Sequence, residues 1–245
     1  MNTIIFISDL HLEEGRPEMT ALFLKFLADA IKKADALYIL GDFFEVWIGD
    51  DHVSSFNQSI LLALKAATEQ GLPIYIMHGN RDFLLGKTFF QRTGCQLLPE
   101  EKVLTLFGKP TLLMHGDTLC THDVAYLKFR KKARCWLVQK LFLWKSLAKR
   151  QAIAAHYRQA SQAHVTTVPD YIMDVAQTEV ERVMQKHQVQ HLIHGHTHRE
   201  AVHSFQLNNK PATRTVLGAW HEHGSALFCY ADGKQELKKI AIDPL

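Results

Sequence analysis

Residues 37–42 read Leu-Tyr-Ile-Leu-Gly-Asp, a short apolar run that stops at a glycine and a carboxylate. Four more apolar runs along the chain also stop at a motif of polar side chains, and they span Ile4 to Ile7, Ile74 to Met77, Leu112 to Met114 and Leu192 to Ile193. Short runs rich in aliphatic residues are typical of parallel strands that are buried on both faces. The sequence therefore predicts an α/β fold.

Each apolar run is followed by a motif whose side chains could do chemistry. The five motifs are Asp9-Leu10-His11, Gly41-Asp42, Gly79-Asn80-Arg81-Asp82, His115-Gly116-Asp117 and Gly195-His196-Thr197-His198. Open α/β sheets bind their ligands at the carboxyl ends of the strands. We therefore expect strand ends on one rim of a sheet to bring these motifs into a single cleft.

Seven side chains in these motifs are candidate metal ligands: Asp9, His11, Asp42, Asn80, His115, His196 and His198. This mixture of oxygen and imidazole donors favours first-row divalent ions such as Mn²⁺, Fe²⁺, Co²⁺ or Zn²⁺, and suits Ca²⁺ poorly. Seven ligands are too many for one catalytic ion with an open position. Two ions can share them if a carboxylate bridges, and Asp42 is the natural bridge. Such a pair predicts hydrolysis of a phosphate ester or anhydride.

The order of the motifs resembles that of the calcineurin-like metallophosphoesterases, from Asp9 to His198. The family pattern is Asp-x-His, Gly-Asp, Gly-Asn-His-Asp/Glu, His and Gly-His-x-His. The resemblance implies a sandwich of two sheets flanked by helices, with a helical lid insertion. Arg81 stands where the family usually has a histidine that assists the leaving group. An arginine does not readily give up its proton, but it can pair with phosphate oxygens and stabilise negative charge.

The longer context resembles, within that family, the UDP-2,3-diacylglucosamine pyrophosphatases of lipid A biosynthesis. The residues that carry this likeness lie at 34–45, 47–51, 79–86, 115–120 and 217–221. The resemblance implies Mn²⁺-dependent cleavage of the pyrophosphate by a water that two metal ions activate. The products would be UMP and 2,3-diacylglucosamine 1-phosphate.

The same resemblance implies roles for individual residues. One Mn²⁺ would be held by Asp9, His11, Asp42 and His198, and the second by Asp42, Asn80, His115 and His196. The catalytic residues would be Asp42, Asn80, Arg81 and His196, and substrate would be bound by Asn80, Arg81, Asp123, Ser161 and His196. The stretch 165–169 lacks the polar residues that relatives commonly have after this serine, so His164 or Arg158 becomes a candidate substitute.

Charge is unevenly distributed along the chain. The segment from Val124 to Pro169 contains ten Lys and Arg residues and no Asp or Glu, whereas the rest carries 18 basic and 25 acidic residues. Apolar residues including Trp136, Phe142 and Trp144 recur in it at helical spacing, which is typical of a helix at an anionic membrane surface. A lid that covers acyl chains, simple packing onto the body and a surface for nucleic acid are the alternatives.

We expect one domain over residues 1–245, with the basic amphipathic helical insertion at about 124–169, because 245 residues with 47% hydrophobic content can bury one sizeable core. Four widely spaced cysteines without a Cys-x-x-Cys pair indicate a reducing compartment. The chain begins without a signal-peptide pattern, and no run approaches the roughly 20 apolar residues that span a bilayer. We therefore expect a cytoplasmic enzyme bound peripherally to the anionic inner membrane, without nucleic acid or an obligate protein partner.

The remaining elements follow from periodicity. Helices are expected over Met19–Lys33, Phe56–Gln70 and Tyr171–Lys186. After His198, antiparallel strands are expected over Ala201–Leu207, Thr213–Leu217, Ala226–Tyr230 and Leu237–Ile242, as a second sheet or its edge.

Other polar residues near the motifs have structural interpretations. We expect His78, His191 and His194 to be structural, Asp82 and Asp117 to orient imidazoles, and Glu45, Asp50, Asp51 and His52 to be loop charges. Two alternatives to the pyrophosphatase stay open at this point. They are another dinuclear-metal phosphodiesterase or nuclease, and a scaffold without catalytic activity.

Overall fold

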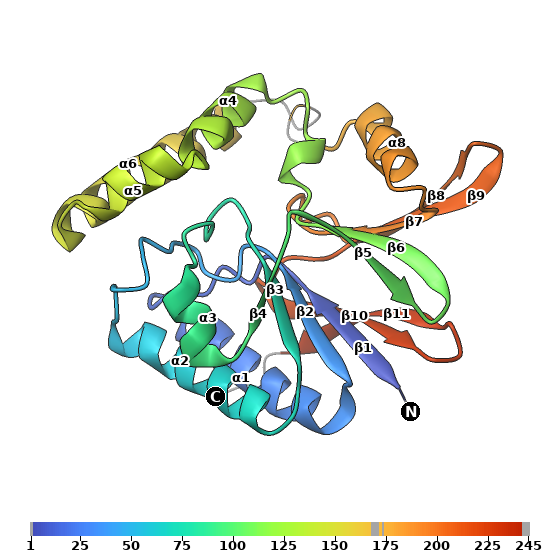
Figure 1. The fold of residues 1–245 in the computed structure, drawn as a ribbon, viewed down its shortest axis with the longest axis horizontal. Helices are drawn as coiled ribbons and strands as arrows, with labels where there is room; N and C mark the ends of the chain where they lie inside the picture. Colours follow the sequence, from blue (N-terminus) through green and yellow to red (C-terminus); the bar gives the residue numbers. More distant parts are fainter. Residues whose placement is uncertain (1, 168–171, 173, 242–245) are drawn as a thin grey trace.

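Two β-sheets pack face to face with helices outside them in the computed structural model, which describes residues 2–167, 172 and 174–241 (Figure 1). One sheet has six strands in the order β11-β10-β1-β2-β3-β4, and the other has five in the order β5-β6-β7-β9-β8. The strands are β1 (Thr3–Ile7), β2 (Ala36–Leu40), β3 (Ile74–Met77), β4 (Gln96–Leu98), β5 (Glu101–Leu106), β6 (Lys109–Met114), β7 (His191–His194), β8 (Ala201–Leu207), β9 (Lys210–Val216), β10 (His223–Tyr230) and β11 (Gln235–Ala241).

The helices cover the outer faces of both sheets and build the insertion. They are α1 (Pro17–Lys33), α2 (Ser55–Glu69), α3 (Lys87–Thr93), α4 (Val124–Ala133), α5 (Trp136–Leu143), α6 (Leu147–Thr167) and α8 (Gln177–Lys186), with a 3₁₀ turn over Asp117–Leu119. In Figure 1, α1, α2 and α3 lie along the six-stranded sheet, while α8 lies beside the five-stranded sheet.

The central strands are mostly apolar because both of their faces are largely buried. In β1, Ile5 and Ile7 pack toward α1 and α2, whereas Phe6 faces the opposite sheet. In β6, Leu113 faces the core between the sheets and Leu112 packs toward α8. Successive side chains of a strand point to opposite faces, so each strand contributes to two cores.

The expectation that the five strand ends lie on one rim of one sheet is wrong. β1, β2 and β3 are parallel neighbours in the six-stranded sheet, whereas β6 and β7 are parallel neighbours in the five-stranded sheet. A strand that is apolar on both faces carries no signal for which sheet it joins. The motifs still meet, because the carboxyl ends of both sheets point to the same end of the sandwich.

The C-terminal strands also divide between the sheets instead of forming one of their own. β8 pairs with β9 at the edge of the five-stranded sheet, while β10 pairs antiparallel with β1 and β11 closes the six-stranded sheet. The strands β4 and β5 escaped the sequence analysis because both are short or largely exposed. The predicted end of the last strand at Ile242 lies outside the described residues.

The three predicted helices are present, with one shifted boundary. α1 and α2 begin within two residues of their expected starts, and Ser54 caps α2 by accepting a hydrogen bond from the backbone of Asn57. α8 begins at Gln177, later than predicted, because residues 174–176 are not helical. The expected start at Tyr171 lies outside the described residues.

The basic insertion forms α4, α5 and α6, which extend away from the sandwich (Figure 1). Within α4 and α5, both described in full, no side chain is buried. Arg130 of α4 contacts Asp117 at 2.6 Å, and the buried Arg150 of α6 donates to the carbonyl of Ile48 at 2.7 Å. The insertion is therefore attached by a few arginines rather than by an apolar core. Its predicted end at Pro169 lies outside the described residues.

Trp220 should be a major contributor to the stability of this fold. Its buried ring packs edge-on against Phe23 and Phe26, and its indole N–H donates to the carbonyl of Ser225 at 3.0 Å. Replacing Trp220 with alanine should lower the free energy of unfolding by about 3–5 kcal/mol, measured by urea titration.

The matched control is Trp144→Ala, because the Trp144 side chain is 77% exposed on the insertion. That substitution should change the free energy of unfolding by less than about 0.5 kcal/mol. Equal losses in the two variants would contradict the assignment of Trp220 to the core.

Candidate metal centre

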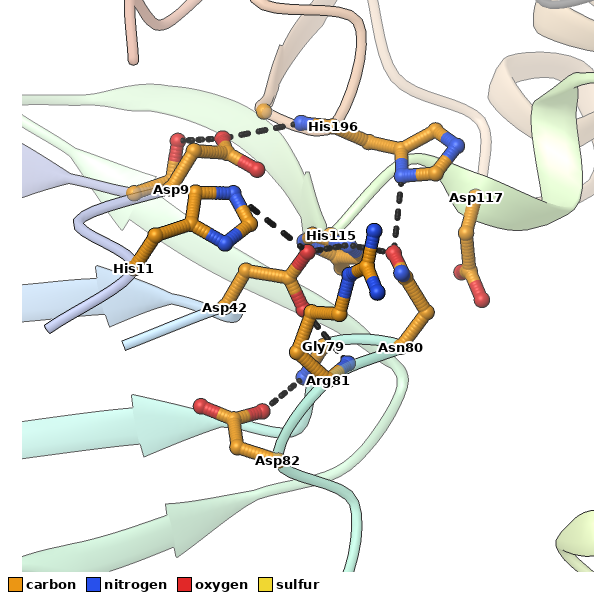
Figure 2. A network of polar contacts seen from close by, with 12 residues as sticks. Asp9, His11, Asp42, Gly79, Asn80, Arg81, Asp82, His115, Asp117 and His196 are labelled. Atoms are coloured by element: carbon orange, nitrogen blue, oxygen red, sulfur yellow. Dashed lines mark hydrogen bonds and ion pairs between the residues drawn. The ribbon is translucent and has the colours of Figure 1, made fainter. Parts of the chain in front are cut away.

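The two sheets are tied together where their motifs meet. The imidazole of His115, which follows β6, donates through Nδ1 to the carbonyl of Leu40 in β2 at 2.8 Å. The backbone amide of His196, which follows β7, donates to Oδ2 of Asp9, which follows β1, at 2.9 Å. These contacts join loops of different sheets into one polar cluster (Figure 2).

One group of candidate ligands consists of Asp9, His11 and His198. One ligand atom from each of the three lies within 4.8 Å of the other two. The Nε2 atoms of His11 and His198 are 3.3 Å apart, and Oδ1 of Asp9 lies 3.5 Å from Nε2 of His198. Their lone pairs can therefore converge on a single ion.

The second group consists of Asp42, His115 and His196, again with ligand atoms within 4.8 Å of one another. The side-chain oxygen of Asn80 lies 2.9 Å from Nε2 of His115 and 2.9 Å from Nδ1 of His196. The contact of His115 with Leu40 uses Nδ1, which leaves Nε2 as its ligating atom. Figure 2 shows Asn80 facing both rings.

Asp42 lies between the two groups. Its Oδ2 is 3.8 Å from Nε2 of His11 and 3.7 Å from Nε2 of His115, while its Oδ1 accepts from the backbone amide of Arg81 at 2.8 Å. A carboxylate in this position has an oxygen within reach of both groups. The sequence-based choice of Asp42 as the bridge is therefore compatible with the geometry.

A divalent cation fits this donor set. Oδ1 of Asp9 is buried and has no hydrogen-bond partner among the described residues, although Oδ2 of the same carboxylate accepts from Ser8 and from the backbone of His196. A buried carboxylate oxygen without a donor is unfavourable unless a cation compensates it. The mixture of carboxylate, amide and imidazole donors suits first-row divalent ions.

The charges of the cluster also favour a bound cation. Burial opposes ionisation of Asp9, but the nearby imidazoles of His198, His115 and His11 hold its pKa below its ordinary value. Burial also opposes protonation of His11, yet Glu45, Asp42 and Asp9 raise its pKa to about 9. Without an ion, protons on histidine balance the carboxylates, so a bound cation would take over that role.

The backbone of the ligands is strained. Five of the seven candidates have a positive φ, between 49° and 69°, and they are Asp9, His11, Asp42, His196 and His198. Residues other than glycine seldom adopt this left-handed conformation, and it costs of order 1 kcal/mol or more at each position. Such residues cluster at functional sites, where the surrounding structure holds them in place.

Two glycines leave room for the ligands. A Cβ atom on Gly79 would collide with the carboxylate of Asp42, and one on Gly195 would collide with the side chains of Asp9 and Ser8. The adjacent ligands therefore require glycine at both positions on steric grounds alone.

The carboxylates next to the ligands contact the backbone and the insertion. Asp82 accepts from the backbone amides of Phe43 and Gly79, at 2.7 and 2.8 Å. Asp117 accepts from Tyr126 and Arg130 of α4, at 2.5 and 2.6 Å. The hydrogen bonds of Asp82 thus hold backbone and those of Asp117 hold the insertion, while a role of either carboxylate in orienting imidazoles stays a prediction.

The histidines interpreted as structural bind neighbouring protein groups. His78 contacts the carbonyl of Leu85, His191 contacts the hydroxyl of Thr213, and His194 contacts the carbonyl of Gly195, each within 2.8 Å.

Three of the five predicted substrate contacts line a cleft next to the ligands. The cleft has a volume of about 590 Å³ and lies between the insertion and the metal-ligand loops, with Asn80, Arg81 and Ser161 on its wall. Nη2 of Arg81 lies 3.5 Å from Oγ of Ser161, and its buried Nε has no hydrogen-bond partner among the described residues. His196 stays with the candidate metal ligands, and Asp123 caps α4 by accepting from the backbone of Tyr126.

The sequence analysis missed two groups around the site. Glu45 was interpreted as a loop charge, but it contacts His11 at 2.7 Å, and its position three residues after Asp42 was the available signal. Aromatic residues of α4 and α6, including Phe129 and Tyr157, line the cleft. The side chain of His164 lies outside the described residues, whereas Arg158 lines the cleft.

Filling the space at Gly195 should impair metal binding. In Gly195→Ala, the new methyl group would displace the carboxylate of Asp9, so affinity for Mn²⁺ should fall at least about tenfold in equilibrium dialysis. Gly15→Ala is the control, because a Cβ there meets nothing within 4 Å. Metal binding by Gly195→Ala equal to that of the unmodified chain would refute the steric argument.

Comparison with known proteins identifies relatives of the whole chain. Residues 3–200 match the calcineurin-like phosphoesterase family. A UDP-2,3-diacylglucosamine hydrolase of Escherichia fergusonii is 53% identical over 228 residues, which cover 93% of this chain and 95% of the relative. The UDP-2,3-diacylglucosamine hydrolase of Shigella sonnei has the same identity and coverage.

Among solved structures, vacuolar protein sorting 29 from Cryptosporidium parvum has the same fold. It superposes with a TM-score of 0.50 and 16% identity, over 97% of this chain and 96% of that one. This chain therefore belongs to the calcineurin-like phosphoesterases and, within them, to the group of the UDP-2,3-diacylglucosamine hydrolases.

Proposed function

We propose that this chain hydrolyses the pyrophosphate bond of UDP-2,3-diacylglucosamine, releasing UMP and 2,3-diacylglucosamine 1-phosphate, with two Mn²⁺ ions as cofactors. The observation that carries the proposal is the cleft of about 590 Å³, which begins at Asn80 and Arg81 and continues between the insertion helices. A two-chain lipid with a diphosphate needs an apolar cavity beside a cationic centre, and this arrangement meets that requirement. The name and the 53% identity of the relatives support the same substrate.

The walls of the cleft favour acyl chains over nucleic acid. Most of its lining is apolar or aromatic, including Trp47, Phe83, Phe129, Leu141, Phe142 and Tyr157. Four basic residues, Arg81, Lys132, Lys145 and Arg158, also line it and can neutralise phosphate charge. A nucleic-acid backbone would need a continuous basic surface instead of this mainly apolar cleft.

The proposed ligand sets follow the two groups of the metal centre. Asp9, His11, Asp42 and His198 would hold one Mn²⁺, and Asp42, Asn80, His115 and His196 would hold the other. When bound, such ions lower the pKa of water and neutralise the charge that develops on phosphoryl oxygens.

Arg81 would bind the diphosphate between the metal centre and the acyl cleft. Its side chain lies beside Ser161, and its unpartnered Nε is free to donate to a phosphate oxygen. Arginine forms paired hydrogen bonds with phosphate and keeps its proton, so Arg81 would stabilise negative charge rather than protonate the leaving group.

The exposed face of the insertion supports peripheral attachment to the cytoplasmic face of an anionic inner membrane. Trp136, Leu137 and Trp144 are 64%, 52% and 77% exposed, and Lys140 belongs to the same segment. Apolar side chains interleaved with lysines bind the interface of anionic bilayers. No helix within the described ranges is both long and apolar enough for a membrane span.

The substrate assignment predicts release of UMP. The chain incubated with UDP-2,3-diacylglucosamine in detergent and Mn²⁺ should form UMP, and Asp42→Ala should lower the rate at least about 100-fold. Asp29→Ala, on an exposed part of α1, should keep the full rate. Hydrolysis of a simple phosphodiester or of nucleic acid without UMP release would instead favour a phosphodiesterase or nuclease.

The membrane proposal predicts a surface-specific loss of binding. The double variant Trp136→Glu and Trp144→Glu should lose most of its co-sedimentation with phosphatidylglycerol vesicles, because it replaces exposed apolar area with charge. Val202→Glu is the control, since Val202 is 58% exposed on β8, away from the insertion. Equal sedimentation of both variants would argue against attachment through the insertion.

A further inference from the structure

We propose that Glu45 is a positioning residue that orients the metal ligand His11 and connects it to the insertion through Arg158. This inference rests on the proposed metal centre and assigns a role to a residue outside both ligand sets. The observation behind it is that the two carboxylate oxygens of Glu45 have different partners. Oε2 contacts His11, and Oε1 contacts Arg158.

The backbone holds Glu45 beside His11. The amide of His11 donates to the carbonyl of Asp42 at 3.0 Å, and the amide of Glu45 donates to the carbonyl of Leu12 at 3.1 Å. The loop after β2 thus runs alongside the loop after β1 through paired hydrogen bonds. These backbone hydrogen bonds alone place Glu45 beside His11, independently of the contacts of its side chain.

One carboxylate oxygen contacts the metal ligand. Oε2 of Glu45 lies 2.7 Å from Nδ1 of His11, which is ion-pair distance, although the angle between them falls outside hydrogen-bond geometry. This contact occupies Nδ1 and leaves Nε2 directed at His198 and Asp42, 3.3 and 3.8 Å away. Carboxylates that bind the second nitrogen of a ligating histidine fix its ring orientation and tautomer.

The other oxygen contacts the insertion. Oε1 of Glu45 lies 3.2 Å from Nε of Arg158 in α6 and 3.9 Å from Nη1 of Arg81. Nη1 of Arg158 lies 3.1 Å from Oε2 of Glu13. The Glu45 side chain is only 12% exposed, so these contacts are weakly screened by water. A movement of α6 at Arg158 would therefore reach His11 through one side chain.

Asp51 is a nearby carboxylate that, within the described part of the chain, only anchors the insertion. Asp51 lies on the same loop and pairs with Arg150 of α6, but it makes no contact with a metal ligand among its described interactions. Asp51 and Glu45 thus each pair with an arginine of α6, Arg150 and Arg158 respectively, but only Glu45 also contacts a histidine of the metal centre. Asp51→Asn is accordingly the matched control for Glu45.

The test measures Mn²⁺ affinity of the full chain without substrate, by isothermal titration calorimetry. Glu45→Ala should weaken the binding of one Mn²⁺ by about 10–100-fold, which is usual for loss of a partner of a ligating histidine. Glu45→Gln should weaken it less, because an amide oxygen of the same shape can keep the close contact with Nδ1. Asp51→Asn should bind both ions as the unmodified chain does.

Kinetics give a second readout. With a phosphodiester that the chain hydrolyses, the kcat of Glu45→Gln should be low at limiting Mn²⁺ and recover at high Mn²⁺, which a purely structural role would not produce. Unchanged affinity in Glu45→Ala, or equal losses in Glu45→Ala and Asp51→Asn, would overturn the inference. Because calorimetry needs no lipid substrate, this failure is distinguishable from failure to release UMP.

Discussion

The hydrogen bond from His115 to the carbonyl of Leu40 joins the two sheets at the point where the site is built. It connects the residue after β6 to the last residue of β2, so it forms only when the two sheets are positioned relative to each other as observed. It also sets which nitrogen of His115 faces Asn80 and Asp42. The packing of the two sheets therefore also fixes the orientation of the His115 ring. A shift of one sheet against the other would turn this candidate ligand away from its position.

Strain in the ligand loops is balanced by the rigid structure around them. Asp9, His11 and Asp42 adopt left-handed backbone conformations that cost free energy, yet nearly every residue of the strands before them, β1 and β2, is buried. Asp82 adds hydrogen bonds from its carboxylate to the amides of Phe43 and Gly79, which hold two loops in register. The free energy of the strained backbone is therefore offset by core packing and by buried hydrogen bonds of residues, such as Asp82, that are not candidate metal ligands.

The insertion is attached to the rest of the chain through charged contacts that lie close to the candidate site. Its helices α4 and α5 bury no side chain, so it is held by charged contacts such as Arg130 with Asp117 and Arg158 with Glu45. Each of these contacts ends next to a candidate metal ligand. Under the proposed function, an insertion attached in this way can admit acyl chains without opening an apolar core. Its arginines would meanwhile keep their contacts beside the metal ligands.

Much of the site was predictable because its chemistry is local. Apolar runs ending in Gly41-Asp42 or Gly79-Asn80 identify strands and ligands together, since a buried strand and the turn after it are encoded by neighbouring residues. The same holds for the helices α1 and α2 and for the basic character of residues 124–169. The sequence by itself therefore determined the residue types, their order and the class of ion they suit. Only the tertiary structure decided that β6 and β7 leave the first sheet and that Glu45 contacts His11. These outcomes depend on the packing of segments distant in sequence, and a residue whose partner is distant carries no local sign of that contact.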